Sequence, residues 1–331
     1  MRAHDIAEES GKVQPAAQHQ VNNEEPKQWH HKAYKEANDR LIYSHVRKLS
    51  GEDKQACMIF TACPLTCRTF AIEKTEKKMN FSLNSIPERT QRPRTYGLTM
   101  VMDKGLSLEE ARNFISANEP HVDIVKLGFG TSFVTPNLRA KIELYQSHNI
   151  PVYFGGTLFE AFLIRNQFDD YLKVVQDYNL KHVEVSDGSI TIPHTEKCGY
   201  IEKLAKHVTV LSEVGSKDAT HIMPPYKWIE LMRAELDAGS TYVIAEAREA
   251  GNVGIYRGSG EVREGLVQEI LTQIPSEKII WEAPQKAQQL YFLELLGANV
   301  NLGNLAPNEV IPLESMRIGL RGDTFFLYLD K

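Results

Sequence analysis

The sequence predicts an α/β fold, a (β/α)8 TIM barrel, with a poorly ordered N-terminal extension. From Tyr96 onward, eight short apolar or β-branched runs recur, and most of them precede a segment with helical periodicity. These units repeat at intervals of about 25 to 35 residues, which is typical of a parallel sheet with right-handed crossovers. Eight units in roughly 250 residues match the size of a closed barrel.

The predicted strands are apolar runs bounded by polar or turn-forming residues. They are Gly97–Asp103, Asp123–Gly128, Pro151–Gly155, His182–Ser186, Thr209–Val214, Tyr242–Ala247, Lys278–Ala283 and Asn299–Gly303. The alternative is an open, doubly wound sheet, which usually carries a glycine-rich phosphate loop after its first strand. Asp103-Lys104-Gly105 stands at that place instead, so the barrel is favoured.

The first connecting helices begin with recognisable signals. Ser107 and Glu110 form a capping box ahead of a helix over Ala111–Ala117. Thr135-Pro136 supplies an N-cap and a proline at the first position of a helix that includes Leu138–Ser147.

A later helix is bounded by proline and glycine. Pro224-Pro225 precede a helical pattern over Trp228–Leu236, and Gly239 is placed to end it. Together with the strands, these helices give one barrel domain over residues 79–331.

Residues 1–78 differ from the rest of the chain, because they are polar and show little periodicity. We expect a disordered or weakly structured extension here, with a weak helical pattern over Tyr34–Leu49. Three cysteines of this region are spaced C-x5-C-x3-C, which matches no common zinc pattern, so we interpret them as ordinary thiols: Cys57, Cys63 and Cys67. Met79 is a candidate translation start.

Composition excludes several classes of protein. The chain has 331 residues and a formal charge of -5, which argues against a broad basic face for nucleic acid. No stretch approaches the roughly 20 consecutive apolar residues of a membrane span. Four cysteines are too few for a disulfide scaffold, which favours a reducing cytoplasm. Barrels of this kind are commonly oligomeric, so we also expect a homo-oligomer.

Strand alternation places charged side chains inside the barrel. Val183 and Val185 should face the helices, which turns Glu184 inward. The same alternation turns inward Lys126, Glu213, Glu246, Arg248, Glu282 and Asn301. Charged residues at the carboxyl ends of barrel strands usually mark the active site.

Glutamates on four adjacent strands are costly to bury without cations. They are a plausible cage for one Mg²⁺, although pairing among the charges themselves is the alternative for any single one. Neighbouring lysine and arginine suit an anionic, phosphorylated substrate.

Three further features allow more than one interpretation. Asn301 to Asn304 lie where many barrels bind phosphate. Arg317 and Arg321 fit phosphate contact and a solvated helix face about equally. Gly155-Gly156-Thr157 offers backbone N–H groups to an oxyanion, or simply makes a tight turn.

The strand-end segments resemble the phosphosulfolactate synthase family over about Tyr96 to Phe325. The resembling segments are Gly97-Leu-Thr-Met-Val-Met-Asp-Lys-Gly105, Val125-Lys-Leu-Gly-Phe-Gly-Thr-Ser132, Gly155-Gly-Thr-Leu-Phe-Glu160, Val183-Glu-Val-Ser-Asp-Gly-Ser189, Glu213-Val-Gly215 with Lys217, Glu246-Ala-Arg-Glu249, Glu282-Ala-Pro-Gln-Lys286 and Gly319-Leu-Arg-Gly-Asp-Thr324. The resemblance implies a (β/α)8 lyase that adds sulfite to phosphoenolpyruvate with Mg²⁺, giving (2R)-phospho-3-sulfolactate. In methanogens this reaction opens coenzyme M biosynthesis.

The resemblance also implies roles for individual residues. Lys217 becomes the candidate general acid, with Glu184 and Glu282 as further catalytic residues. The expected metal ligands are Glu184, Glu213 and Glu246. The expected substrate-binding residues are Lys126, Arg248, Gly155, Gly156, Asn301 and Arg321.

Two other functions stay open at this point. One is a different Mg²⁺-dependent barrel enzyme acting on a phosphorylated three-carbon acid, including a Schiff-base aldolase that uses Lys126. The other is a non-catalytic protein that keeps the barrel, since the family is also similar to plant heat-stress-associated proteins.

Overall fold

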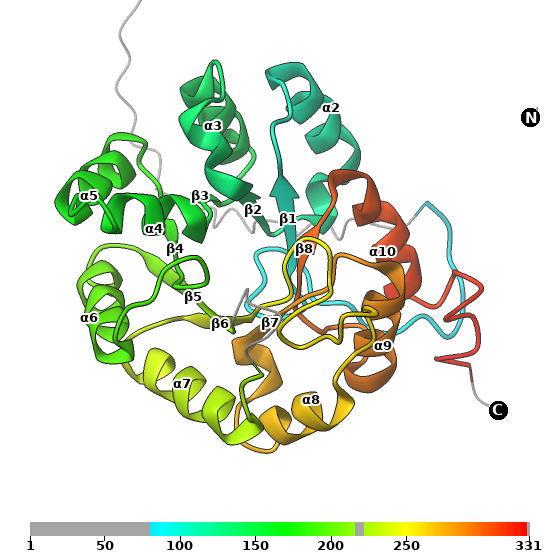
Figure 1. Cartoon of the computed structure of the whole chain (residues 1–331). Helices are drawn as coiled ribbons and strands as arrows, with labels where there is room; N and C mark the ends of the chain where they lie inside the picture. Colours follow the sequence, from blue (N-terminus) through cyan, green and yellow to red (C-terminus); the bar gives the residue numbers. More distant parts are fainter. Residues whose placement is uncertain (1–79, 216–221, 330–331) are drawn as a thin grey trace, which may run out of the picture. The chain divides into compact units, whose positions relative to one another are not determined.

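The computed structural model describes residues 80–215 and 222–329. Within these ranges, eight strands form a parallel sheet in the order β3-β2-β1-β8-β7-β6-β5-β4, and helices surround it (Figure 1). The sheet curls into a nearly closed barrel, so the predicted (β/α)8 fold is confirmed. The extension with its cysteines, Met79 and Lys217 lie outside the described residues.

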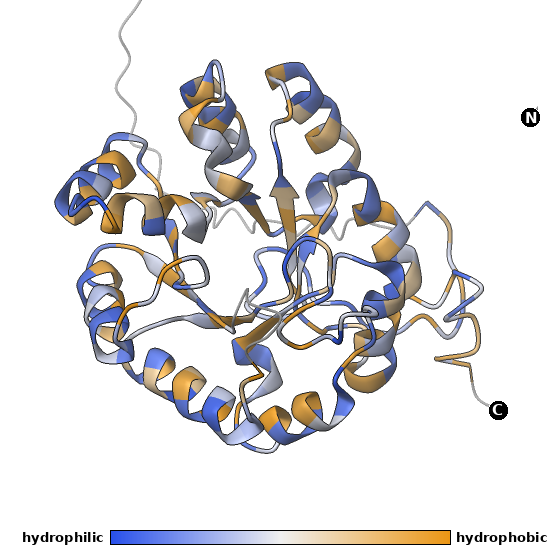
Figure 2. Ribbon diagram, in the orientation of Figure 1, coloured by the Kyte–Doolittle hydropathy of each residue, from blue (hydrophilic) through white to orange (hydrophobic). Residues whose placement is uncertain are grey.

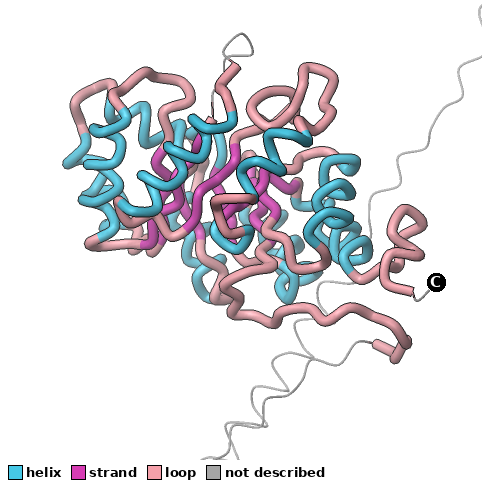
Figure 3. Tube along the Cα trace, turned by 90° about the horizontal axis from the view of Figure 1, so that it is seen from below, coloured by secondary structure: helices cyan, strands magenta, loops and turns pink. Residues whose placement is uncertain are grey.

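Short strands alternate with helices along the described chain. The strands are β1 (Thr99–Asp103), β2 (Ile124–Leu127), β3 (Val152–Phe154), β4 (His182–Val185), β5 (Thr209–Val214), β6 (Tyr242–Ala245), β7 (Ile279–Glu282) and β8 (Leu302–Leu305). The α-helices are α2 (Leu108–Asn118), α3 (Leu138–Ser147), α4 (Gly156–Leu163), α5 (Phe168–Asp177), α6 (His194–Ala205), α7 (Pro225–Asp237), α8 (Glu264–Leu271), α9 (Lys286–Leu296) and α10 (Val310–Arg317). Figure 3, turned by 90° from Figure 1, shows the strands in the middle with helices around them and loops at the ends.

Side chains join the two ends of the hydrogen-bonded strand order, β3 and β4. The Tyr153 hydroxyl donates to Glu184 Oε2 at 2.9 Å, and the Gly156 N–H donates to Glu184 Oε1 at 2.7 Å. A buried glutamate on β4 therefore fastens β3 and the start of α4 to its own strand.

Two apolar layers hold the barrel. The outer layer lies between sheet and helices, where valines such as Val183 and Val210 pack against helical residues such as Ile201. The helices carry hydrophobic and hydrophilic residues together, as amphipathic helices on a sheet do (Figure 2). The inner layer comprises Leu98, Met100, Ile124, Tyr153, Leu211, Ile244 and Ile280. This layer fills the barrel interior, so the polar residues further along the strands lie above a buried apolar layer.

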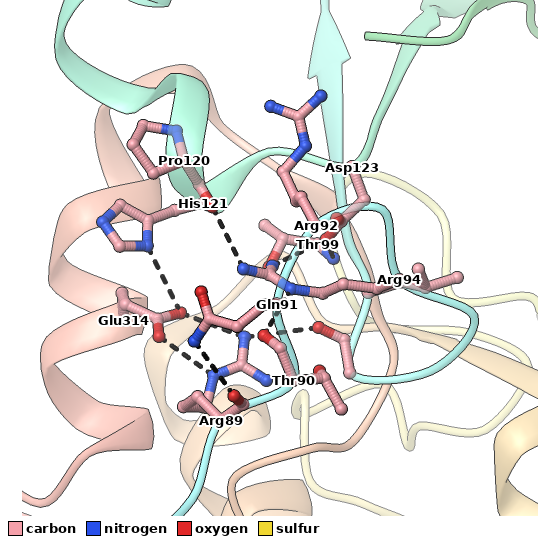
Figure 4. A network of polar contacts seen from close by, with 12 residues as sticks. Arg89, Thr90, Gln91, Arg92, Arg94, Thr99, Pro120, His121, Asp123 and Glu314 are labelled. Atoms are coloured by element: carbon pink, nitrogen blue, oxygen red, sulfur yellow. Dashed lines mark hydrogen bonds and ion pairs between the residues drawn. The ribbon is translucent and has the colours of Figure 1, made fainter. Parts of the chain in front are cut away.

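The segment before β1 is fastened across the amino-terminal end of the barrel (Figure 4). Arg89 donates to both carboxylate oxygens of Glu314 on α10, at 2.9 and 3.1 Å. Arg94 donates to Asp123 Oδ2 at 3.0 Å just before β2. These ion pairs are nearly buried, so they tie the segment to the body of the barrel.

Two local predictions are confirmed and two are wrong. Ser107 and Glu110 form the capping box of α2, and Gly239 follows α7 with φ +110°. Thr135 does not cap α3, since its hydroxyl donates to the Thr131 carbonyl and Asn137 is the N-cap residue. The last strand was predicted over Asn299–Gly303 but spans Leu302–Leu305, because its backbone pairing with β1 and β7 starts at Leu302.

Candidate active site

A cavity of about 410 Å³ opens at the carboxyl ends of the strands. Its lining is Met102, Lys126, Phe129, Gly155, Thr157, Glu184, Ser189, Glu213, Glu246, Arg248, Glu249, Ala250, Asn252, Glu282 and Asn304. The polar end of the barrel interior is therefore the place where a small, charged molecule would meet the protein.

Four glutamates from adjacent strands converge on this cavity, as strand alternation predicts. Glu184 lies on β4, Glu213 on β5 and Glu282 at the end of β7, while Glu246 directly follows β6. All four are at most 4% exposed. Carboxylate oxygens of three of them, Glu213, Glu246 and Glu282, lie within 4.8 Å of one another. This spacing suits one cation shared by three carboxylates.

Lys126 reaches the same cluster from β2. Its Nζ lies 3.0 Å from Glu184 Oε2, 3.5 Å from Glu282 Oε1 and 3.6 Å from Glu213 Oε2. The lysine is 6% exposed, so its ammonium is held among carboxylates with little access to solvent. The single ammonium of Lys126 is thus the shared counter-ion of three buried glutamates.

The pKa shifts reflect this surplus of negative charge. Burial raises the pKa of Glu282 to about 7, because Lys126 offsets the burial only in part and the carboxylate of Glu213 adds to it. Burial alone would lower the pKa of Lys126, but Glu184, Glu282 and Glu213 together raise it well above its usual value. The lysine therefore stays charged, and the cluster could still accept a further cation.

Glu184 is already fully engaged by protein donors. Oε1 accepts from the Gly156 N–H, and Oε2 lies close to both the Tyr153 hydroxyl and the Lys126 ammonium. Both of its oxygens are thus occupied, and it is absent from the group of three whose oxygens meet. Glu282 also accepts a backbone N–H, from Ala247 at 2.9 Å, but it belongs to the group of three whose oxygens meet, so Glu213, Glu246 and Glu282 are the three that could hold a cation.

The two glycines after β3 make room for this arrangement. A Cβ at Gly156 would lie 2.1 Å from Ser186 Oγ and 2.9 Å from Glu184 Oε1. The Gly155 N–H donates to the Leu127 carbonyl at 3.0 Å, and a Cβ there would lie 3.2 Å from Lys126 Cε. Both N–H groups are therefore used inside the protein. Close packing at the turn therefore accounts for these two glycines, while Thr157, the third residue of the predicted anion site, lines the cavity.

The loop after β6 carries Arg248 to the cavity wall. Arg248 has φ +56°, and its N–H donates to Glu246 Oε1. Gln288, in the first turn of α9, donates to the carbonyls of Gly251 at 2.8 Å and Gly260 at 3.1 Å. The side chains of Glu246 and Gln288 thereby hold the backbone of this loop, and the loop places Arg248 at the cavity.

Two predicted substrate-binding residues lie away from this cavity. Asn301 is 1% exposed; its amide donates to the Glu277 and Ile279 carbonyls and accepts from the Leu98 N–H, at the amino-terminal end of the barrel. Its strand parity was predicted correctly, but it sits too early on the strand to meet a substrate. Arg321 lies 3.6 Å from Asp323 and does not line the cavity. We therefore drop both from the candidate site.

Arg317 fits neither of its two interpretations. It is fully buried and donates to the carbonyls of Ala298, Val300 and Leu98, which contribute to the amino-terminal floor of the barrel. It is a structural residue of that floor.

Sequence reasoning missed several residues of the site. Tyr153 could have been found, because it alternates with Val152 and Phe154, which face the helices. Asn304 lines the cavity from β8; it belongs to the stretch Asn301 to Asn304 that was predicted to bind phosphate, but Asn301 was chosen from that stretch because the strand was placed too early. Asn252 lies on the loop after β6, where periodicity carries no signal.

Comparisons with known proteins bear on this site. Residues 87–323 match the family model of (2R)-phospho-3-sulfolactate synthase (ComA). The phosphosulfolactate synthase of Methanothermobacter thermautotrophicus is 40% identical over 244 residues, which cover 72% of this chain and 95% of that protein. That of Bacillus subtilis is 38% identical over 251 residues, covering 75% and 99%. Among the described residues, we find no helix with the length and apolar character to cross a membrane.

Proposed function

The chain belongs to the (2R)-phospho-3-sulfolactate synthase family, and from that premise we propose that it adds sulfite to phosphoenolpyruvate with the help of Mg²⁺. It is an enzyme that forms a carbon–sulfur bond, and its product is (2R)-phospho-3-sulfolactate. The observation that carries the proposal for the site is the convergence of four buried glutamates and Lys126 at the carboxyl ends of the strands.

The donor set suits a hard divalent cation. Mg²⁺ prefers oxygen ligands and binds through a few carboxylates together with water and substrate oxygens. Glu213, Glu246 and Glu282 offer one oxygen each within 4.8 Å of one another. A lysine ammonium is already drawn among them, which supports the view that this place attracts positive charge. We assign the metal to these three glutamates.

The reaction balances without an oxidant or reductant. The sulfur lone pair of sulfite attacks the terminal methylene carbon of phosphoenolpyruvate and forms the C–S bond. The electrons of the C=C bond move toward the substrate carboxylate, and a proton is then added to the carbon that bears the phosphate. When bound, Mg²⁺ supplies a Lewis acid that stabilises negative charge on that carboxylate.

The remaining charged residues serve the anionic substrates. Lys126 and Arg248 lie at the cavity and provide cations for phosphate, carboxylate or sulfite groups. Lys217 stays our predicted general acid, and it lies outside the described residues. Replacing Lys217 with alanine should abolish most turnover while leaving metal binding intact. Full turnover by this variant would remove the general-acid role.

A substrate panel tests the proposed function. The purified full-length protein is incubated with Mg²⁺ and phosphorylated three-carbon acids, each with and without sulfite, and products are followed by phosphorus NMR and mass spectrometry. We expect a sulfite-dependent product from phosphoenolpyruvate that disappears on chelation. Turnover without sulfite would favour another barrel enzyme of the same substrate class. No product from folded protein would favour a non-catalytic barrel.

A cytoplasmic location and a homo-oligomeric assembly stay predictions from composition and fold. A link to coenzyme M biosynthesis would apply only to a host that makes this cofactor.

A further inference from the structure

Lys126 makes ion pairs with three of the glutamates in the site. Its ammonium lies 3.5 Å from Glu282 Oε1 and 3.6 Å from Glu213 Oε2, and both of these glutamates belong to the group assigned to the metal. Its third partner, Glu184 Oε2 at 3.0 Å, does not belong to that group. The lysine therefore contacts two carboxylates assigned to the metal and one that is not.

We propose that Lys126 and a divalent cation compete for the carboxylates of Glu213 and Glu282. When the cation binds, Lys126 leaves both carboxylates, keeps Glu184 and turns its freed N–H donors toward the anionic substrate. This inference rests on the proposed function, because it takes the metal to bind at Glu213, Glu246 and Glu282.

The Lys126 ammonium and a bound Mg²⁺ would lie too close together to share the same carboxylates. Mg²⁺ binds carboxylate oxygens at about 2.1 Å. If the metal takes the same two oxygens, an ammonium that stays 3.5 and 3.6 Å from them would lie within roughly 6 Å of it, where burial limits the screening of the repulsion by solvent. Each carboxylate would also have to divide its negative charge between two cations. Movement of Lys126 away from the two glutamates relieves both effects.

Glu184 is built to keep the lysine after this exchange. The Gly156 N–H and the Tyr153 hydroxyl hold its two oxygens at 2.7 and 2.9 Å, so the carboxylate cannot follow the metal. Gly155 lets the lysine chain lie against the backbone, because a Cβ there would press on Lys126 Cε at 3.2 Å. The lysine thus has a fixed carboxylate partner at its end.

The exchange gives Lys126 two tasks in sequence. Without metal, its charge holds together glutamates that would otherwise repel one another. With metal bound, the same charge becomes available to a substrate anion at the cavity. The substrate therefore meets its lysine only after the metal has bound, which predicts ordered binding with metal first.

Calorimetry of metal binding by Lys126→Met tests the competition. Mg²⁺ and Mn²⁺ are titrated, without substrate, into wild-type full-length protein and into the variant. We expect the variant to bind metal about tenfold more tightly or better, since it has lost the competing cation. Lys104→Met is the matched control, because Lys104 is exposed and pairs with Glu249 rather than with the three glutamates. Unchanged or weaker metal binding by Lys126→Met would overturn the proposal.

Footprinting of the wild-type protein covers the case in which Lys126→Met does not fold. Reductive methylation of Lys126 is followed by mass spectrometry with and without Mg²⁺. Release from two carboxylates should make the lysine react faster with metal present, and an equal or slower rate would overturn the proposal. If neither protein binds metal, the metal site of the proposed function fails and the exchange fails with it. If metal binds with equal affinity to both, only the exchange fails.

Discussion

Glu184→Gln distinguishes a structural anchor from a metal ligand. The change keeps the size of the side chain but removes its charge, and it replaces one acceptor oxygen with an NH2 group. In the wild-type protein, both oxygens accept from buried donors: Gly156 N–H on one, Tyr153 hydroxyl and Lys126 on the other. Whichever way the new amide turns, a donor faces a donor.

The magnitude follows from that conflict. An unsatisfied buried donor costs about 1–3 kcal/mol, and the relief of repulsion among the remaining glutamates offsets part of this. We therefore expect a net loss of about 2 kcal/mol in the free energy of unfolding. For a barrel of this size the melting temperature should fall by about 4–8 °C. Metal affinity should fall by less than the roughly tenfold expected for the loss of a ligand, because Glu184 acts only by keeping Lys126 away from Glu213 and Glu282.

The assay combines calorimetric unfolding in chelator with titration of Mg²⁺ into the same protein. Glu249→Gln is the control, since this glutamate also lines the cavity but its side chain is 51% exposed. The control should unfold within about 0.5 kcal/mol of wild type. A Glu184→Gln protein that keeps its stability but loses most of its metal affinity would show that Glu184 is a metal ligand and not a structural anchor.

Other predictions follow from the same structure. Glu246→Gln should weaken Mg²⁺ binding at least about tenfold, measured by calorimetry, without lowering the melting temperature in chelator; unchanged affinity would remove it from the metal site. Arg89→Leu removes both hydrogen bonds that Arg89 donates to the buried Glu314 carboxylate and leaves it only the more distant Arg317 and His121, so it should cost about 3 kcal/mol in urea unfolding at pH 7, against almost nothing for the exposed Arg112→Leu. Burial raises the pKa of Glu314, but Arg89 lowers it to a net value below the usual 4.5. The stability from this pair is therefore complete above pH 4.5 and lost as the pH falls through the folded-state pKa, so the gap between wild type and Arg89→Leu should narrow in acid. A chain that starts at Met79 should fold, because the family match begins at residue 87; an insoluble product would contradict this.

The barrel could be predicted from the sequence because its signals are local. Each strand is a short apolar run, and alternation within it decides which residues turn inward, so Glu184, Glu213 and Lys126 were all placed in the interior. Capping signals at Ser107 and a stop signal at Gly239 identified helix ends for the same reason.

The partners of those inward residues could not be predicted, because they depend on contacts between strands. Nothing in the local pattern shows that Glu184 is held by Tyr153 and Gly156 from β3 while Glu282 faces the other glutamates. Asn301 shows the second limit, since parity gives the direction of a side chain but not its height along the barrel axis. The pairing of β8 places that residue at the floor.

Anomalous diffraction from crystals grown with Mn²⁺ would locate the metal among the glutamates. We expect a single manganese peak in the cavity, bound by Glu213, Glu246 and Glu282, with Glu184 still bonded to Gly156 and with Lys126 moved away from Glu213 and Glu282. A peak bound by Glu184, or ordered crystals with no peak among the three glutamates, would contradict it.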